Sequence, residues 1–224
     1  MHAKMTSAPF VSHPSHAIKC PERVHSDICG DFNSVTIGGN CYLATLIDNM
    51  LGMLWVHPLK QKSDFLSWFT QMDSMFANQY GRHVGALRTD NGGEYVNQNL
   101  REYYSHHGIH LELTVPYTPQ QNGIAKCANH TITECMCVMM KDHHCPLGLW
   151  GEAACTAAYC LNHTATSSNG GIMPIEAFNG KLPNISHMCT FYSDAYIHHC
   201  KDHGAKKLGD RAVLVKFAGY PVMV

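Results

Sequence analysis

The hydrophobic period of this sequence changes several times, and the order of those changes limits the folds open to the chain. Three short apolar runs rich in β-forming residues, each bounded by turn residues, cover 23–30, 41–48 and 52–59. Over 62–81 the apolar side chains instead recur every three or four residues, which indicates an amphipathic helix with Ser63 as its N-cap and Gly81 as its stop. This order predicts an α/β chain whose first three strands run antiparallel.

Strand and helix patterns continue through the second half of the chain. A strand is expected over 83–90, a helix over 97–108 and another strand over 109–116, where Pro116 closes it. Two further helices are expected, one from about 120 to 143 and one over 146–164. Beyond the second of these the pattern breaks into loop, with one possible final strand over 211–220.

Length and composition indicate one globular domain with additions at its ends. The chain has 224 residues, of which 45% are hydrophobic and 15% charged, so a disordered or fibrous chain is excluded. We predict an extended arm over 1–20, a core over 21–164 and a C-terminal extension over 165–224.

The sequence favours an intracellular chain without a membrane partner. No charged start followed by an apolar run opens it, so we expect no secretory signal. The longest apolar stretch, 41–55, contains Asp48 and Asn49 and is too short to span a bilayer. The 11 cysteines include no CxxC pair, and we expect reduced thiols.

The charge balance argues against tight binding to a nucleic-acid backbone. The formal net charge is −1 with histidine neutral. Phosphate binding relies on clustered lysine and arginine side chains, so any affinity for nucleic acid should be weak.

Two aspartates lie where predicted strands end, Asp27 in HSDICG and Asp90 in RTDNGGEY. Carboxylates that converge from neighbouring strands would offer the hard oxygen ligands that suit Mg²⁺. Surface aspartates in turns would give the same spacing. Position alone therefore leaves both interpretations open.

A series of motifs extends the argument to nearly the whole chain. In order they read RVHSDICG, GALRTDNGGEY, GIHLELTVPYTPQQNGIA, LWGEAACTAAYCLNHT and AFNGKLPN. From about 4 to 220 this series resembles the integrase core of copia-type retrotransposons. The resemblance implies an α/β, RNase H-like fold, with a mixed five-stranded sheet flanked by helices. It also implies a polynucleotidyl transferase in the nucleus, with DNA as partner, possible homo-oligomers and no membrane.

In that family two aspartates and one glutamate hold two Mg²⁺ or Mn²⁺ ions. The resemblance assigns Asp27 and Asp90 as the catalytic and metal-binding aspartates, and its spacing of thirty-five intervening residues places the glutamate at Lys126. A protonated lysine has no lone pair for a metal. At ~4 Å and an effective dielectric near 20, one pair of unit charges interacts by about 4 kcal/mol, so a dication would be repelled.

We therefore expect weak metal binding, a catalytically inactive copy, and a pairing of Lys126 with Asp27 or Asp90. Glu134 lies eight residues further along the same helix, about 12 Å away, and Glu94 comes from another element, so neither is expected to replace the lost glutamate.

The resemblance also assigns nucleic-acid contacts to Asn122, Gly123 and Asn129, around the start of the helix that carries Lys126. At Cys127, His130 and His163 the family tends to have arginine. The chain has 5 arginines beside 17 histidines and 11 cysteines, which leads to the hypothesis of a decaying copy that has lost DNA-binding charges.

Two other interpretations remain open. A non-catalytic nucleic-acid or protein-interaction module could retain the fold. Zinc binding is the other, through two groups of closely spaced residues: His13, His16 and Cys20, and His198, His199, Cys200 and His203. The family's zinc module precedes its core, and we expect the arm over 1–20 to be a remnant that follows a missing module.

Overall fold

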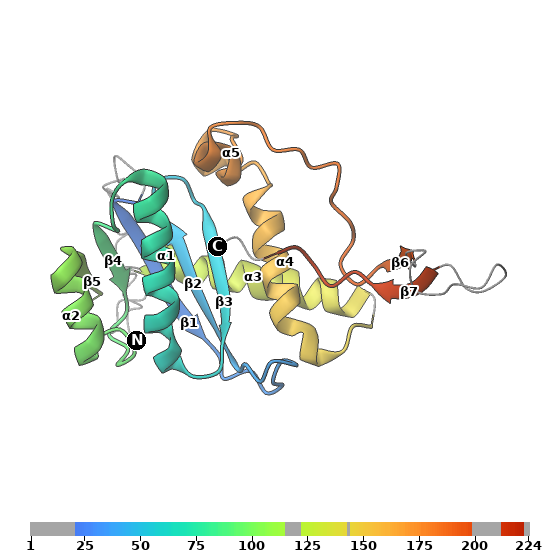
Figure 1. Cartoon of the computed structure of the whole chain (residues 1–224), viewed down its shortest axis with the longest axis horizontal. Helices are drawn as coiled ribbons and strands as arrows, with labels where there is room; N and C mark the ends of the chain where they lie inside the picture. Colours follow the sequence, from blue (N-terminus) through green and yellow to red (C-terminus); the bar gives the residue numbers. More distant parts are fainter. Residues whose placement is uncertain (1–20, 115–121, 143, 199–211, 222–224) are drawn as a thin grey trace, which may run out of the picture.

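The computed structural model describes residues 21–114, 122–142, 144–198 and 212–221. Within them a five-stranded sheet has the order β3-β2-β1-β4-β5 (Figure 1). Its strands are β1 (Arg23–Cys29), β2 (Tyr42–Asp48), β3 (Leu54–Leu59), β4 (Ala86–Thr89) and β5 (His110–Leu113). The first three strands pair antiparallel, whereas β1, β4 and β5 pair parallel. The mixed sheet expected from the sequence is confirmed.

Helices connect and cover the strands. They are α1 (Phe65–Tyr80), α2 (Gln98–His107), α3 (Gly123–Asp142), α4 (Trp150–Asn162) and α5 (Pro174–Asn179). Short 3₁₀ turns are η1 (Lys62–Asp64), η3 (Leu147–Leu149) and η4 (Ser167–Asn169). A separate antiparallel pair, β6 (Asp194–His198) and β7 (Ala212–Lys216), stands away from the sheet (Figure 1).

Apolar side chains cover the sheet on both faces, because residues along a strand point alternately to opposite sides. In β3, Trp55 belongs to the core formed with α1 and α2. Its neighbours Leu54 and Val56 belong to the core formed with α3 and α4. The sheet is therefore the middle layer between two pairs of helices.

Helix α1 follows the predicted apolar stripe but begins differently. Phe65, Phe69 and Phe76 are fully buried on its inner side, and Gly81 ends it with a φ of 70°. The expectation of Ser63 as N-cap is wrong. A 3₁₀ turn, η1, precedes the helix, and it is Gln61 that forms a capping box at the start of that turn.

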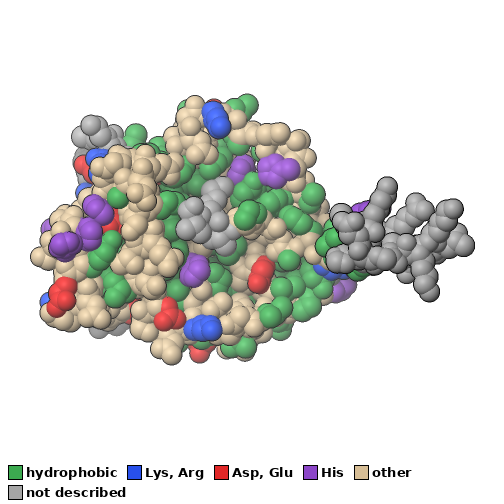
Figure 2. Space-filling view, viewed as in Figure 1, with side chains coloured by type: hydrophobic (Ala, Val, Ile, Leu, Met, Phe, Trp, Pro, Cys, Tyr) green, Lys and Arg blue, Asp and Glu red, His purple; other side chains and the backbone are tan. Residues whose placement is uncertain are grey.

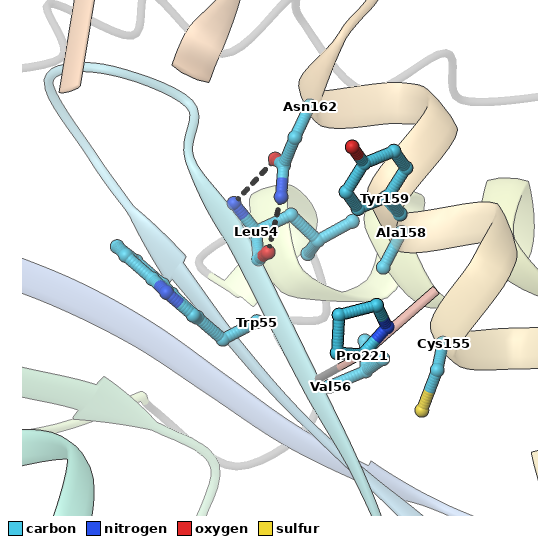
Figure 3. A pocket seen from close by; sticks show the side chains of 8 residues that line it. All are labelled: Leu54, Trp55, Val56, Cys155, Ala158, Tyr159, Asn162 and Pro221. Atoms are coloured by element: carbon cyan, nitrogen blue, oxygen red, sulfur yellow. Dashed lines mark hydrogen bonds between the residues drawn. The ribbon is translucent and has the colours of Figure 1, made fainter. Parts of the chain in front are cut away.

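A side-chain clamp closes the outer edge of β3 (Figure 3). The amide of Asn162, at the end of α4, donates to the Leu54 carbonyl at 2.7 Å and accepts from the Leu54 N–H at 2.9 Å. This amide occupies edge groups that another strand could otherwise pair with. The pocket drawn beside the clamp holds about 30 Å³, room for no more than a few waters, so it is a packing gap.

The region after 164 has more structure than the sequence indicated. The final strand is present as β7, but its partner β6 and helix α5 were not expected. The zinc candidates His13, His16, Cys20, His199, Cys200 and His203 lie outside the described residues. The division into arm, core and extension stays a prediction.

Two further expectations concern membranes and thiols. None of the helices in the described ranges is both long enough and apolar enough to cross a bilayer. The nine cysteines within these ranges are free thiols.

Candidate active site at the ends of strands β1 and β4

Sheet register brings the two candidate aspartates together. Strands β1 and β4 pair in parallel, with His25 opposite Arg88. This parallel pairing ends there, but Asp27 lies two residues after His25 and Asp90 two residues after Arg88. Both carboxylates are close enough to Tyr95 to affect its pKa. Asp27 is buried within β1, whereas Asp90 follows β4 directly and is half-buried. Two residues separated by more than sixty positions thus share one edge of the site.

The turn after β4 fixes the Asp90 carboxylate. The Gly92 N–H donates to Asp90 Oδ1 at 3.0 Å. A Cβ at Gly92 would lie 2.7 Å from the carboxyl group of Glu94, so a larger residue here would displace that side chain. Asn91 ties the same turn to β5 by donating to the Thr114 carbonyl at 3.0 Å.

Both carboxylate oxygens of Asp27 have partners from α3. Lys126 Nζ lies 3.5 Å from Oδ1, and the Asn129 side chain donates to Oδ2 at 2.9 Å. Positions three apart in a helix share a face, so these two side chains reach the strand together. Asn129 also accepts a hydrogen bond from the Thr45 hydroxyl of β2. The aspartate thus meets a cation on one side and a buried amide on the other.

Two of the three residues expected to contact nucleic acid, Asn122 and Asn129, are buried. Asn122 is 1% exposed and donates to the Ser26 carbonyl at 3.1 Å, which fixes the start of α3 on β1. Asn129 is 5% exposed, with its amide engaged by Asp27 and Thr45. Both amides are engaged inside the fold, and their contact with nucleic acid stays a prediction. Gly123 is half-buried, and its contact with nucleic acid stays a prediction.

Sequence reasoning missed Tyr95, a buried residue near the two aspartates. The phenol is fully buried, and its hydroxyl is 3.2 Å from Ser26 Oγ. Burial raises the pKa of Tyr95 well above its usual value, the negative charges of Asp27 and Asp90 raise it further, and the Ser26 hydrogen bond opposes them. Tyr95 is therefore a neutral phenol. Tyr95 is the last residue of the motif DNGGEY, so the sequence places it in a motif of the site but does not indicate that it is buried near the aspartates.

The divalent ions implied by the resemblance do not fit these residues. Lys126 occupies the position of the third carboxylate, and Asp27 already has a partner at each oxygen. The Lys126 side chain is 43% exposed, so solvent screens the ion pair, and the pair stabilises the fold little. An ammonium at this distance still opposes a cation bound to the same carboxylate.

Neither alternative acid completes the site among the described residues. Glu94 Oε1 lies 3.1 Å from Lys62 Nζ. Glu134 is 67% exposed and lies 3.2 Å from the ring of His130. Both carboxylates therefore have cationic or imidazole partners of their own.

Comparisons with known proteins bear on the family and the fold. Residues 19–119 match the family model described as integrase core domain. The retrovirus-related Pol polyprotein from transposon TNT 1-94 of Nicotiana tabacum is 34% identical over 220 residues, which are 98% of this chain and 16% of the polyprotein. That from transposon RE2 of Arabidopsis thaliana is 28% identical over 97% of this chain and 15% of the polyprotein. The chain thus spans about a sixth of the length of these relatives.

Two solved structures share the fold. One is the HTLV-2 integrase catalytic core domain in complex with magnesium (trimeric form), with a TM-score of 0.54 and 18% identity over 70% of this chain and 95% of that chain. The other is a simian T-cell lymphotropic virus intasome in complex with PP2A regulatory subunit B56 gamma, with a TM-score of 0.58 and 15% identity over 86% of this chain and 66% of that chain. Residues 19–119 thus match the integrase core family, and the described residues have the RNase H-like fold of these integrase structures.

Proposed function

We propose that this chain is the integrase core of a copia-type retrotransposon in which the catalytic site no longer supports strand transfer. The motif series supports the copia type, and the family supports DNA integration as the ancestral activity. The observation that carries the inactive assignment is the contact of Lys126 with Asp27 at 3.5 Å. Lys126 puts a cation in place of a metal ligand, at the point where three carboxylates would have to converge.

The rest of the site is preserved around this substitution. Asp27 lies on β1, Asp90 directly follows the neighbouring strand β4, Tyr95 is a neutral phenol near both, and Asn129 donates to the first aspartate. Lys126 offsets the negative charge of Asp27. The Asp27 carboxylate therefore has a compensating charge without a bound cation.

The proposal extends to partners and location. DNA would be bound weakly, because the chain carries 16 lysine and arginine residues against 17 acidic ones. Self-association and a nuclear location are proposed from family membership. The trimeric form and the intasome are properties of the two solved structures, and they support self-association here only by kinship.

The test compares the unaltered chain with Lys126→Glu and Lys126→Gln. We expect Lys126→Glu to bind Mg²⁺ and Mn²⁺ at least about tenfold more tightly in calorimetric titrations, since a repelling charge becomes a ligand. Lys126→Gln removes the charge without adding a carboxylate, so it should gain less. On a labelled duplex with either metal, the unaltered chain should give no joined product.

Two results would count against the proposal. Strand joining by the unaltered chain would show that the site works with lysine at 126. Equal metal affinity in all three proteins would show that this position is not part of a metal site. Circular dichroism of each variant checks that the comparison is between folded proteins.

A further inference from the structure

A second group of metal-ligating side chains lies away from the candidate active site. It consists of Asp73 on α1, His83 before β4 and His107 at the end of α2, and one ligand atom from each lies within 4.8 Å of the others. His83 precedes β4, whereas Asp90 follows it, so the group lies at the opposite end of this strand. Histidine side chains gather over α2 on the face shown in Figure 2.

Asp73 fixes the orientation of His83. Its carboxylate is fully buried, and Oδ1 accepts from the Val84 N–H at 2.8 Å. Oδ2 accepts from the Tyr103 hydroxyl at 2.7 Å and lies 2.7 Å from His83 Nδ1. An ionised carboxylate can only accept, so His83 carries its proton on Nδ1. In the neutral ring, Nε2 therefore keeps a lone pair.

That lone pair faces a second imidazole. His83 Nε2 lies 3.2 Å from His107 Nδ1. Two nitrogens bound tetrahedrally to zinc at 2.0–2.1 Å are about 3.3 Å apart, so the rings already have the spacing of two ligands.

We propose that His83 and His107 bind a divalent transition-metal ion of the zinc class, with Asp73 as the carboxylate that orients His83. This is the carboxylate–histidine–metal arrangement in which an outer carboxylate sets the tautomer and ring angle. Binding through Nδ1 requires His107 to carry its proton on Nε2. Water fills the remaining positions, and the 37% exposure of the His83 side chain gives the ion an open path.

The ligand chemistry separates this site from the one at Asp27. Imidazole nitrogens suit zinc, copper and nickel, whereas Mg²⁺ prefers carboxylate oxygens and water. The proposed ion would join α2 to the segment that leads into β4. Because it would bind the folded chain, it should raise the midpoint of thermal unfolding.

The test uses the whole chain titrated with zinc and followed by NMR of the histidine ring nitrogens. We expect one equivalent to shift the resonances of His83 Nε2 and His107 Nδ1, and Mg²⁺ to shift neither. Equilibrium dialysis should find one zinc fewer per chain in His107→Ala and in His83→Gln than in the unaltered protein. The control is His130→Ala, at a residue that is 75% exposed on α3, and it should keep the full number.

Other histidines and cysteines will take up zinc at high concentration. The test is therefore the difference in zinc content between the variants and the unaltered protein. Equal zinc content in the unaltered protein and His107→Ala would overturn the proposal, as would unshifted ring resonances of both histidines. His83→Gln disturbs a buried carboxylate and can unfold the chain. If His83→Gln does not fold, the NMR titration of the unaltered protein tests the proposal without it.

Discussion

Asn129 shows how a single buried amide determines the geometry of this site. It donates to Asp27 and accepts from Thr45, so it connects β1, β2 and α3 at one point. Removing it would leave a carboxylate oxygen and a hydroxyl without partners in a region where water has little access. The residue is therefore more important for the shape of the site than the exposed lysine one turn before it.

We expect Asn129→Ala to lower the free energy of unfolding by about 1–3 kcal/mol, the usual cost of leaving buried polar groups unpaired. Urea denaturation measures the change. His130→Ala, at the exposed neighbouring position, is the control and should change the stability by less than about 0.5 kcal/mol. A similarly small loss in Asn129→Ala would show that Asp27 and Thr45 find other partners.

His25 makes stability depend on pH. It is 1% exposed, with Nε2 at 3.0 Å from Asn49 Oδ1. Burial lowers its pKa below 6.5, the charges of Arg88 and Arg23 lower it further, and Asn49 and Glu112 act in the opposite direction. The unfolded chain therefore binds this proton more readily than the folded chain. As far as His25 is concerned, the free energy of unfolding has its full value above about pH 6.5 and falls as the pH drops below that value.

We expect denaturation curves at about pH 7.5 and 5.5 to show this loss, with at most about 1.4 kcal/mol per pH unit from one histidine. His25→Gln keeps an amide donor for Asn49 but does not titrate, so its stability should fall less with pH. His130→Gln should keep the slope of the unaltered protein. An unchanged slope in His25→Gln would assign the effect to other groups, such as His57, whose pKa burial also lowers.

Among the elements, β3 and α4 depend on the Asn162 clamp. The two hydrogen bonds to Leu54 join the end of a helix to an edge strand that has no neighbour on that side within the described sheet. Packing between α4 and β3 alone is apolar and sets no register along the strand. The clamp supplies that register.

We expect Asn162→Ala to cost about 1–3 kcal/mol of unfolding free energy, because a backbone N–H and a carbonyl lose their buried partner. Asn78→Ala, at an exposed position in α1, is the matched control and should stay within about 0.5 kcal/mol of the unaltered chain. Hydrogen exchange at the Leu54 amide offers a second measurement. It should accelerate in the first variant only.

At the scale of the whole molecule, charge limits the proposed activity. On the face shown in Figure 2, lysine and arginine side chains are scattered and form no continuous patch. The formal net charge is −1. Long-range attraction to a polyanion is therefore small, and contacts with phosphate must be few.

We expect the affinity for a short labelled duplex to depend only weakly on salt. Each phosphate contact adds about 0.9 to the slope of log affinity against log salt, so fluorescence anisotropy between about 50 and 200 mM salt should give a slope of magnitude below about 3. A charge-neutral protein of similar size is the control for non-specific binding. A steeper slope would favour the alternative of a nucleic-acid-binding module that has kept the fold.

Local patterns in the sequence determined the order of the elements and the chain positions of Asp27, Asp90 and Lys126. Hydrophobic period and motif spacing are properties of neighbouring residues, so they can be interpreted without coordinates. Such local patterns predicted the wrong N-cap, Ser63, because the 3₁₀ turn before α1 depends on how the chain leaves β3. The exposed strand β6 has no buried face and left no periodic signal.

Only the tertiary structure decided which distant residues meet. The partners of Asp27 come from α3, about a hundred positions further along the chain, and the turn after β4 brings Tyr95 near both aspartates. The proposed zinc site likewise joins residues from α1, the segment before β4 and α2. Contacts of this kind follow from strand register and helix packing, which depend on the whole core rather than on any local stretch.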